Sequence, residues 1–343
     1  MNRRSSLLIL VALAVIIVGA FFFAQRNNEE PSRELKTIGV VQHTKGLDLV
    51  YEGLKKGMAG LGYREGVDIV FEYQFSEGNP DRVREITREY LAKDVDLIFA
   101  ITSSAVREVV KETKAANRDD LPVVFTNGVT VLEDGVVASY QSSGNNTTGL
   151  IPDDTAISVK KLEFLTQINP AAKRVGVFIS PNPVSAKEKT LSALEDKGRL
   201  LGISVVRYEI PVDAATRTAD AGARQVAGTI KHGDIDAIMT IPDPVVTTPA
   251  VSGILAELGM REKIPTLFLN IVDGGLLAYN LDLVASGEQA AVMVDKIFSG
   301  TLPKDIPIEF PEKNVLIIDT RTARDIGVTI PDSLIRIADQ VLR

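Results

Sequence analysis

The fold of this chain follows from the stretch KTIGVVQHTKGLDLVYEGLKKGMAGL, which covers residues 36–61. Its first residues, 36–41, are rich in Ile and Val, as buried β-strands are. Apolar residues then recur every three or four positions between Leu47 and Leu61, which is the spacing of one face of an amphipathic helix. The stretch therefore predicts a strand, a polar loop and a helix, the first half of a βαβ unit.

The same alternation of strand and helix continues along the rest of the chain. A turn-rich segment at residues 142–146 interrupts it, and the Gly274-Gly275 pair marks a second break. Strands that alternate with crossover helices form parallel, doubly wound sheets, so we expect an α/β protein with two such lobes. The expected strands are 36–41, 67–73, 96–101, 122–125, 174–179, 204–210, 237–241, 266–269, 276–280 and 314–318. The expected helices are 47–61, 81–93, 104–117, 154–167, 185–201, 217–231, 246–258 and 287–298, with a closing helix after 318.

The segments that follow the second break are too few to make a third domain, so we expect them to return to the two lobes. The chain would then cross between the lobes three times, near Asn145, Gly275 and Pro307, and the three connections would make a hinge. The expected limits are 36–145 with 276–306 for the first lobe, and 146–275 with 307–343 for the second lobe.

The N-terminal residues 1–35 predict export from the cytoplasm. Arg3 and Arg4 precede the uncharged apolar stretch 7–24, which fits both a cleaved signal peptide and a retained membrane anchor. Residues 27–33 form a polar tether. Since flanking basic residues stay on the cytoplasmic side, both alternatives place the lobes in the periplasm or on the outer face of the membrane. We expect membrane contact only through this apolar helix, because the chain has no Cys to carry a lipid.

Composition and motifs exclude several classes of function. The net charge of −7 disfavours a nucleic-acid partner, because such proteins carry clustered Lys and Arg. Without Cys there is no disulfide, thiolate nucleophile or Cys-ligated metal. His43 and His232 lie in separate expected lobes and lack metal-ligand spacing. No P-loop, G-x-S-x-G or H-E-x-x-H motif occurs. We therefore expect no catalytic residue, no metal and no cofactor.

Candidate ligand-binding residues follow the expected strand ends. Ligands of open α/β sheets bind outside the carboxyl ends of the strands, where helix N-termini present N–H groups. Capping of helices and turns is the alternative role for Ser, Thr, Asn and Asp at such positions. The candidates of the first lobe are Gln42, His43, Asp48, Thr102, Ser103, Ser104 and Asn127. Those of the second lobe are Asn182, Ser185, Asp243, Asn270 and Asp273.

From residue 36 to the C-terminus the chain also resembles a known family, the ABC-transporter substrate-binding proteins of the tryptophan/tyrosine-binding type, which have the type I periplasmic binding fold. The resemblance rests on several short motifs, which are specific only through their common order and register along the chain. The motifs are Ile38 to Gln42, Leu47-Asp48 with Gly62-Tyr63, Val95 to Ile98, Pro122 to Phe125, Gly144 to Gly149, Lys263 to Pro265, Leu276 to Asp282, Ile326-Gly327 with Ile330-Pro331, and Ala338-Asp339.

The resemblance implies a monomeric receptor that delivers a small solute to an ABC permease and its ATPase. The family's cleft corresponds by position to Gln42, Asp48, Thr102 to Ser104, Asn182, Ser185 and Asp243. Two loops depart from the family pattern: the loop after residue 41 is two residues short, and Val129-Thr130-Val131 replaces the usual Thr-Asp-Pro. The expected ligand is therefore an aromatic amino acid, another amino acid or a small polar solute.

Two other functions remain open from the sequence. A membrane-anchored receptor subunit could use the same two lobes to sense a ligand and signal to a partner, although the chain has no signalling domain of its own. An enzyme would need a nucleophile with a base, or a metal centre, and neither pattern is visible. The sequence therefore favours an extracytoplasmic solute-binding protein that closes at a hinge.

Overall fold

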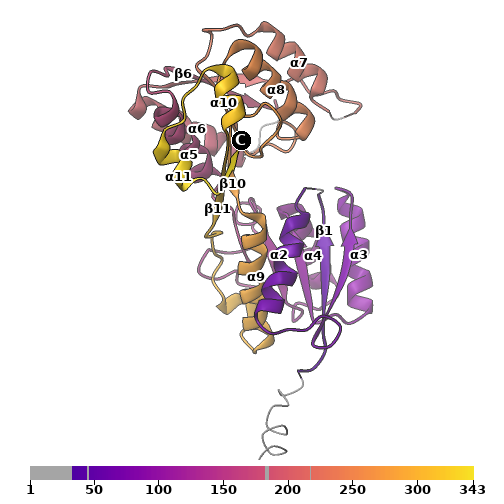
Figure 1. Cartoon of the computed structure of the whole chain (residues 1–343). Helices are drawn as coiled ribbons and strands as arrows, with labels where there is room; N and C mark the ends of the chain where they lie inside the picture. Colours follow the sequence, from indigo (N-terminus) through magenta and orange to yellow (C-terminus); the bar gives the residue numbers. More distant parts are fainter. Residues whose placement is uncertain (1–32, 45, 182–184, 217) are drawn as a thin grey trace, which may run out of the picture.

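The computed structural model of this protein describes residues 33–44, 46–181, 185–216 and 218–343. It consists of two α/β lobes joined by a narrow waist (Figure 1). The apolar stretch 7–24, in which the sequence predicts a signal or anchor helix, lies outside the described residues. Within the described ranges, no helix combines the length and the hydropathy needed to cross a membrane.

The first lobe is built on a five-stranded sheet in the order β2-β1-β3-β4-β5. All four neighbouring pairs of strands are parallel, as expected for strands that alternate with crossover helices. Its strands are β1 (Lys36–Gln42), β2 (Ile69–Phe75), β3 (Leu97–Ile101), β4 (Val123–Thr126) and β5 (Thr147–Gly149), and its helices are α2 (Asp48–Gly60), α3 (Pro80–Ala92), α4 (Ser103–Ala115) and α9 (Leu283–Phe298), with the short helix η1 (Pro303–Asp305).

The second lobe is built on a seven-stranded sheet in the order β12-β11-β10-β9-β8-β6-β7. Only the β10–β11 pair is antiparallel. Its strands are β6 (Arg174–Ile179), β7 (Ser204–Glu209), β8 (Ala237–Thr240), β9 (Thr266–Phe268), β10 (Leu277–Leu281), β11 (Asn314–Asp319) and β12 (Gln340–Leu342), and its helices are α5 (Asp154–Ile168), α6 (Ser185–Leu201), α7 (Asp220–Thr229), α8 (Pro249–Glu262), α10 (Thr320–Ile326) and α11 (Asp332–Ile337).

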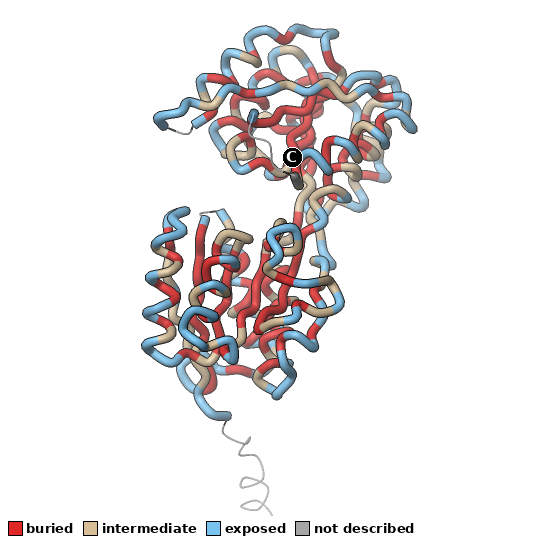
Figure 2. Tube along the Cα trace, turned by 180° about the vertical axis from the view of Figure 1, so that it is seen from behind, coloured by how far each residue is buried: buried red, intermediate tan, exposed pale blue. Residues whose placement is uncertain are grey.

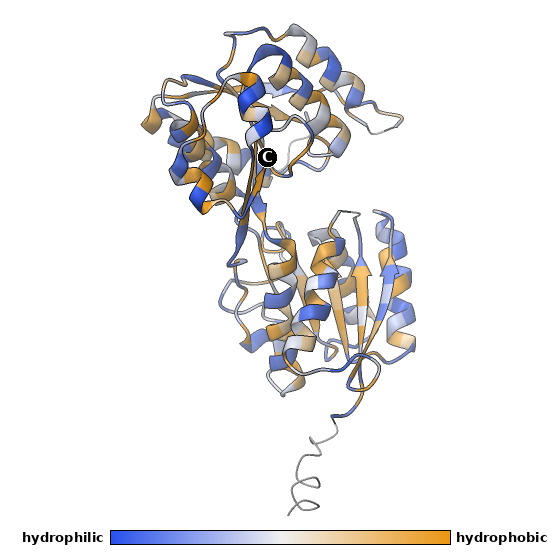
Figure 3. Cartoon of the chain, in the orientation of Figure 1, coloured by the Kyte–Doolittle hydropathy of each residue, from blue (hydrophilic) through white to orange (hydrophobic). Residues whose placement is uncertain are grey.

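Both sheets are buried between helices. Figure 2 shows the strands as buried traces and the outer turns of the helices as exposed ones. Figure 3 shows the same division as apolar strands flanked by helices of mixed hydropathy. Each sheet has an apolar cluster on either face, which is the arrangement that a doubly wound parallel sheet requires.

A buried tyrosine fastens α3 to the first sheet. Tyr90 is 0% exposed, and its hydroxyl donates to the carbonyl oxygens of Val40 at 2.9 Å and Glu72 at 2.6 Å. The ring needs a glycine beneath it, because a Cβ at Gly39 would lie 2.5 Å from Tyr90 Cδ2. The contact holds the two strands that lead to the carboxyl edge of this sheet.

Helix α9 returns to the first lobe and packs along α2 (Figure 1). The two backbones touch at glycines: a Cβ at Gly53 would lie 2.1 Å from the carbonyl oxygen of Val284, and one at Gly287 would lie 2.1 Å from that of Val50. The sequence prediction placed the helix start at residue 287, whereas α9 begins at Leu283, where Asp282 caps it by accepting from Ala285 N at 3.0 Å.

The chain crosses between the two sheets three times within the described residues. The crossings are 150–153, between β5 and α5; 282, between β10 and α9; and 306–313, between η1 and β11. A three-crossing connection is therefore present, as the sequence predicts. The first two crossings lie a few residues beyond the predicted places, and the third includes Pro307.

Strand pairing also changes the residue limits that we propose for the two lobes. The sequence assigned residues from 146 onward to the second lobe, yet β5 pairs with β4 of the first sheet. It assigned residues 276–306 to the first lobe, yet β10 pairs with β9 and β11 of the second sheet. The cause is the same in both cases, because turn residues mark the end of an element and not the sheet that the next strand joins.

Most predicted elements agree with the structure to within three or four residues, and β6 and α6 agree at both ends. Three short strand or helix segments were not predicted: β5, η1 and β12. The single closing helix expected after residue 318 is instead two short helices, α10 and α11, followed by β12. Gly327, at φ +75°, ends α10, since a left-handed residue stops a helix.

Candidate functional site

The carboxyl edge of the first sheet contains three buried polar atoms without a hydrogen-bond partner among the described residues. They are Gln42 Oε1, Thr126 Oγ1 and Asn127 Oδ1. Gln42 and Thr126 end β1 and β4, and both are in register with Ile101 of the intervening strand β3. Buried polar atoms are nearly always hydrogen-bonded in folded proteins, so this edge has the capacity to bind an additional polar group.

Backbone strain marks the same edge. Thr102, directly after β3, has φ +94° and ψ +152°, a region that β-branched residues rarely occupy and that costs about 1–3 kcal/mol. Its N–H donates to the carbonyl oxygen of Thr126 at 3.0 Å, and its Oγ1 accepts weakly from Ala105 N at 3.5 Å, which caps α4. Asn127 is left-handed as well, at φ +54°. Strained residues cluster at ligand-binding sites.

The two serines beside Thr102 already have partners. Ser103 Oγ accepts from Thr130 N at 3.0 Å, which ties the start of α4 to the loop that departs from the family pattern. Ser104 Oγ accepts from Arg107 at 3.4 Å. The structure therefore brings Thr102, Ser103 and Ser104 to the strand edge, as predicted, and the two serines also contact the Thr130 backbone and the Arg107 side chain.

His43 and Asp48 lie at the entrance of α2. His43 is 7% exposed, and its Nδ1 lies 2.7 Å from Ser76 Oγ. Burial, with a smaller contribution from the charge of Arg107, lowers the pKa of His43 below 6.5, which favours the neutral ring. Asp48 is exposed and is approached by Gly46 N and Tyr73 Oη, each at 3.4 Å. His43 is thus held in a buried contact beside this edge, whereas Asp48 is open to solvent.

Asp243 anchors the corresponding edge of the second sheet. It is 4% exposed, and its Oδ2 accepts from Ser180 N at 2.8 Å and from Ser180 Oγ at 2.7 Å. Lys187 Nζ lies 3.7 Å from the same oxygen, and Oδ1 accepts from Val245 N at 3.1 Å. The sequence left Asp243 between a capping role and an ammonium-binding role, and in this conformation its carboxylate points inward and supports the loop.

The other predicted residues of the second lobe lie in different surroundings. Asn270 and Asp273 are exposed in the loop between β9 and β10, and Asn270 Oδ1 accepts from Asn280 Nδ2 at 3.5 Å. Asn182 lies outside the described residues. Ser185 is the first residue of α6. These four positions stay predictions as ligand contacts.

Sequence reasoning missed several polar residues at the strand ends. Thr126 follows the expected strand 122–125 and was not singled out, and Thr240 was counted as a strand residue. Lys161 and Lys187 fall within the expected helices 154–167 and 185–201 and were not singled out either. A signal existed for Lys161, since it lies between apolar positions on α5: Ser158, Leu162 and Leu165 are all buried around it. A charged residue within an apolar helix stripe indicates a buried contact, and Lys161 is 0% exposed.

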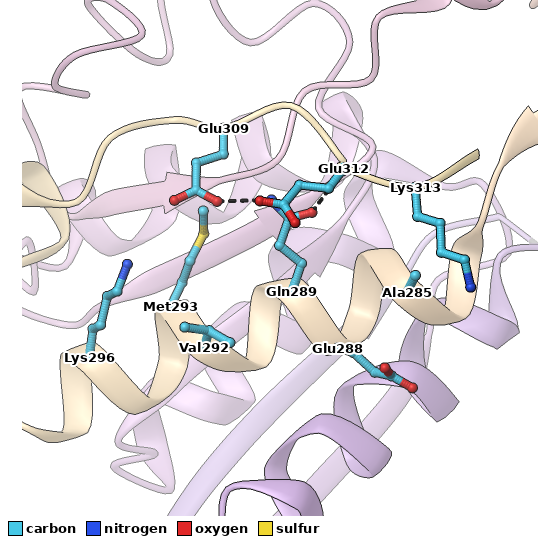
Figure 4. A pocket seen from close by; sticks show the side chains of 9 residues that line it. All are labelled: Ala285, Glu288, Gln289, Val292, Met293, Lys296, Glu309, Glu312 and Lys313. Atoms are coloured by element: carbon cyan, nitrogen blue, oxygen red, sulfur yellow. Dashed lines mark hydrogen bonds between the residues drawn. The ribbon is translucent and has the colours of Figure 1, made fainter.

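Two hollows in the surface of the described residues lie away from the strand ends. One of about 480 Å³ runs along α9 and the third crossing. In Figure 4 Gln289 reaches across it, donating to Glu309 Oε2 at 2.9 Å and accepting from Glu312 N at 3.1 Å. A second hollow, of about 210 Å³, is lined by Asp153 of the first crossing, Pro311 of the third crossing and residues of α5, β10 and β11. Both hollows therefore lie beside the connections between the lobes.

In the part of the chain that the structure describes, no three His, Asp or Glu side chains gather as metal ligands would. The edge of the first sheet instead has amide and hydroxyl groups, and buried lysine and aspartate side chains support the edge of the second sheet. Such groups recognise a small polar or charged solute by hydrogen bonds and charge.

Comparison with known proteins agrees with this geometry. Residues 35–342 match the family described as "ABC transporter substrate binding protein". A curated relative, the tyrosine-binding protein of Clostridioides difficile (strain R20291), is 24% identical over 310 residues, which are 88% of this chain and 85% of that protein.

Solved structures share the fold. The ABC domain from Streptococcus pneumoniae in complex with L-Trp has a TM-score of 0.73 at 21% identity and covers 90% of this chain and all of that one. A substrate-binding protein with adhesive properties from Clostridium difficile, in its ligand-free, open form, has a TM-score of 0.72 at 22% identity and covers 90% of this chain and 99% of that one. The two-lobed α/β fold is thus that of type I periplasmic binding proteins.

Proposed function

Since this chain belongs to the family of ABC transporter substrate-binding proteins, we propose that it captures an amino acid, first of all an aromatic one, between its two lobes and delivers it to the permease of an ABC importer. Proteins of this family bind a solute outside the cytoplasm and are not enzymes. The tyrosine-binding relative and the L-Trp complex support an aromatic amino acid as ligand.

The observation that carries the proposal is the set of unpartnered atoms on the first lobe. Gln42 Oε1 and Asn127 Oδ1 are amide acceptors, and Thr126 Oγ1 both donates and accepts. An α-ammonium group supplies three donors. The N-terminus of α4, which begins at Ser103, suits the carboxylate of the amino acid, because N–H groups at a helix start favour an anionic group. Together these features suit a zwitterionic amino acid.

Capture would proceed by closure at the three crossings. A ligand shifts an equilibrium between open and closed forms only through contacts that it makes better in the closed form. The strand edges of both lobes carry buried polar groups, so each lobe has contacts to offer once the other approaches. The permease would then recognise the closed form, with an ATPase driving transport, the receptor acting as a monomer and the N-terminal apolar helix serving as signal or tether.

The proposal is tested by calorimetry of the full chain with the standard amino acids, beginning with L-tyrosine and L-tryptophan. The variant Asn127→Gly keeps the left-handed backbone without strain and removes only the amide. We expect it to weaken binding about tenfold, since a hydrogen bond to a charged group contributes about 1.5–3 kcal/mol.

The matched control is Asn117→Gly. Asn117 is also left-handed, at φ +52°, but it follows the C-terminal end of α4, away from the strand edge, so affinity should not change. Absence of heat with every amino acid would exclude the proposed ligand class. Equal affinities of the two variants and the unaltered protein would exclude Asn127 from the site.

A further inference from the structure

A glutamine side chain ties helix α9 to the third crossing. Gln289 lies on α9 in the first lobe, and it reaches across the hollow of about 480 Å³ to residues 309–312 (Figure 4). Its Nε2 donates to Glu309 Oε2 at 2.9 Å and to the carbonyl oxygen of Phe310 at 3.1 Å. Its Oε1 accepts from Glu312 N at 3.1 Å. The amide therefore uses both its donors and its acceptor on one short segment of the connection between the lobes.

The first half of the third crossing is fastened to the first lobe through its backbone. Ile308 N donates to the carbonyl oxygen of Tyr140 at 2.8 Å. Glu309 N donates to that of Gly149, the last residue of β5, at 3.1 Å. The carbonyl oxygen of Glu309 accepts in turn from Ile151 N at 3.0 Å. Residues up to Glu309 are therefore part of the first lobe, and they hold the first crossing to it as far as Ile151.

Beyond Glu309, the third crossing depends on Gln289. Among the described residues, the side chain of Gln289 is the only hydrogen-bond partner of the backbone of 310–312. The ring of Phe310 adds a contact with the ring of Tyr140, at 5.3 Å between the centroids. Without the glutamine, this ring contact alone would hold the three residues to the first lobe, and the flexible part of the crossing would be longer.

The three crossings have a hollow in common. Asp282 N donates to the carbonyl oxygen of Lys313 at 3.0 Å, which joins the second crossing to the end of the third. The hollow of about 210 Å³ is lined by Asp153, Leu281 and Asn314, which belong to or adjoin the three crossings in turn. Packed interiors resist movement, so a hollow at this place leaves room for the lobes to turn. We therefore expect the third crossing to bend at Lys313.

We propose that Gln289 is a positioning residue of the hinge: it confines the bending of the third crossing to Lys313 and so raises the affinity for the amino acid without touching it. A longer flexible connection would let the open lobes adopt more relative orientations, and closure would then lose more conformational entropy. A pre-organised connection reduces that loss. The inference rests on the proposed function, because only a ligand that closes the lobes is affected by the stiffness of the hinge.

The test is calorimetry of the full-length variant Gln289→Ala with L-tyrosine and L-tryptophan. We expect the affinity to fall about tenfold, because three residues gain backbone freedom in the open form, and the loss should appear in the entropy of binding. Hydrogen exchange at Glu312 N should become faster in the ligand-free variant, since this N–H loses its acceptor. The matched control is Lys296→Ala. Lys296 is exposed and lines the same hollow further along α9, so the affinity of this variant should equal that of the unaltered protein.

An exchange of donor and acceptor separates this contact from general effects of substitution. Gln289→Glu keeps an acceptor for Glu312 N but sets a carboxylate against that of Glu309, so the affinity should fall. Glu309→Gln alone should leave the affinity unchanged, because its amide oxygen still accepts from Gln289. In the double variant an amide again faces a carboxylate, with the two roles reversed, and most of the lost affinity should return. Thermal melting establishes which variants are folded.

The outcomes are distinguishable. If the unaltered protein binds tyrosine or tryptophan and folded Gln289→Ala binds it equally well, the inference is wrong and the proposed function stands. An equal loss in Lys296→Ala, or a double variant that binds no better than Gln289→Glu, would also overturn the inference, because the effect would then not depend on the contact with the third crossing. If the unaltered protein binds neither amino acid, the proposed function fails and this inference fails with it.

Discussion

At the scale of single residues, the site is marked by groups that the fold leaves unsatisfied or strained. Gln42, Thr126 and Asn127 have buried atoms with no partner in the described part of the chain, and Thr102 has a backbone conformation that glycine adopts far more readily. Each of these features costs stability in the ligand-free chain. Their concentration at one sheet edge indicates selection for binding at the expense of stability.

Thr102→Gly separates strain from recognition. Glycine relieves the positive φ, and because its greater unfolded-state entropy offsets part of the gain, we expect a net stabilisation of about 1 kcal/mol and a higher melting temperature. Affinity for the amino acid should fall, since the side chain that caps α4 at the site is gone. Calorimetry and thermal melting measure the two effects separately.

The control for this variant is Thr229→Gly. Thr229 is an exposed helical residue at the end of α7 without positive φ, so glycine there should lower the melting temperature. If Thr102→Gly lowers the melting temperature as Thr229→Gly does, the positive φ of Thr102 does not destabilise the folded protein.

At the scale of elements, the contact between α2 and α9 fixes how the chain returns to its first lobe. Gly53 and Gly287 bring the two helix backbones together, and Ala290 and Ala291 continue the close face. Only residues without a large side chain permit such a contact. Because α9 follows directly from the second crossing, this contact also fixes the point at which the chain enters the first lobe after β10.

Gly53→Ala should destabilise the protein by about 1–3 kcal/mol, the cost of overpacking a filled contact. The added Cβ would lie 2.1 Å from the carbonyl oxygen of Val284, so the helices must separate. Urea denaturation gives the change in free energy of unfolding. Gly60→Ala is the control on the same helix: nothing lies within 4 Å of its Cβ position, and it should be neutral or slightly stabilising. Equal effects of the two substitutions would contradict this packing.

At the scale of the whole molecule, the separation of the two strand edges is the central feature. The two lobes are joined at the waist (Figure 1), and the two hollows described above line the crossings and not the strand ends. A solute would complete its contacts only when the second edge approaches the first.

Closure should therefore be visible as compaction. Small-angle X-ray scattering of the full chain with saturating L-tyrosine or L-tryptophan should give a smaller radius of gyration than the ligand-free chain, because both edges then contact one solute. The Asn127→Gly variant at the same ligand concentration should show a smaller change. An unchanged radius of gyration in the presence of bound ligand would exclude closure as the mechanism.

Much of the fold was determined by the sequence alone. The alternation of Val- and Ile-rich runs with amphipathic stretches was sufficient to predict two doubly wound lobes. Parallel strands joined by crossover helices bury both kinds of segment in a regular way. The family motifs and the strand-end rule were sufficient to bring Gln42, Thr102 and Asn127 to one edge. These are local patterns, so a linear sequence displays them.

What only the tertiary structure decided depends on contacts between distant residues. Short strands such as β5 and β12 form because a neighbouring strand offers free hydrogen-bonding groups, which no local pattern shows. The inward orientation of Asp243 follows from Ser180 and Lys187, which come from a different strand end and helix. The burial of Lys161 against Thr240 likewise joins residues 79 apart in the chain. The surroundings of Lys161 and Asp243 are therefore a property of the fold, because they arise where α5, α6 and the end of β8 meet.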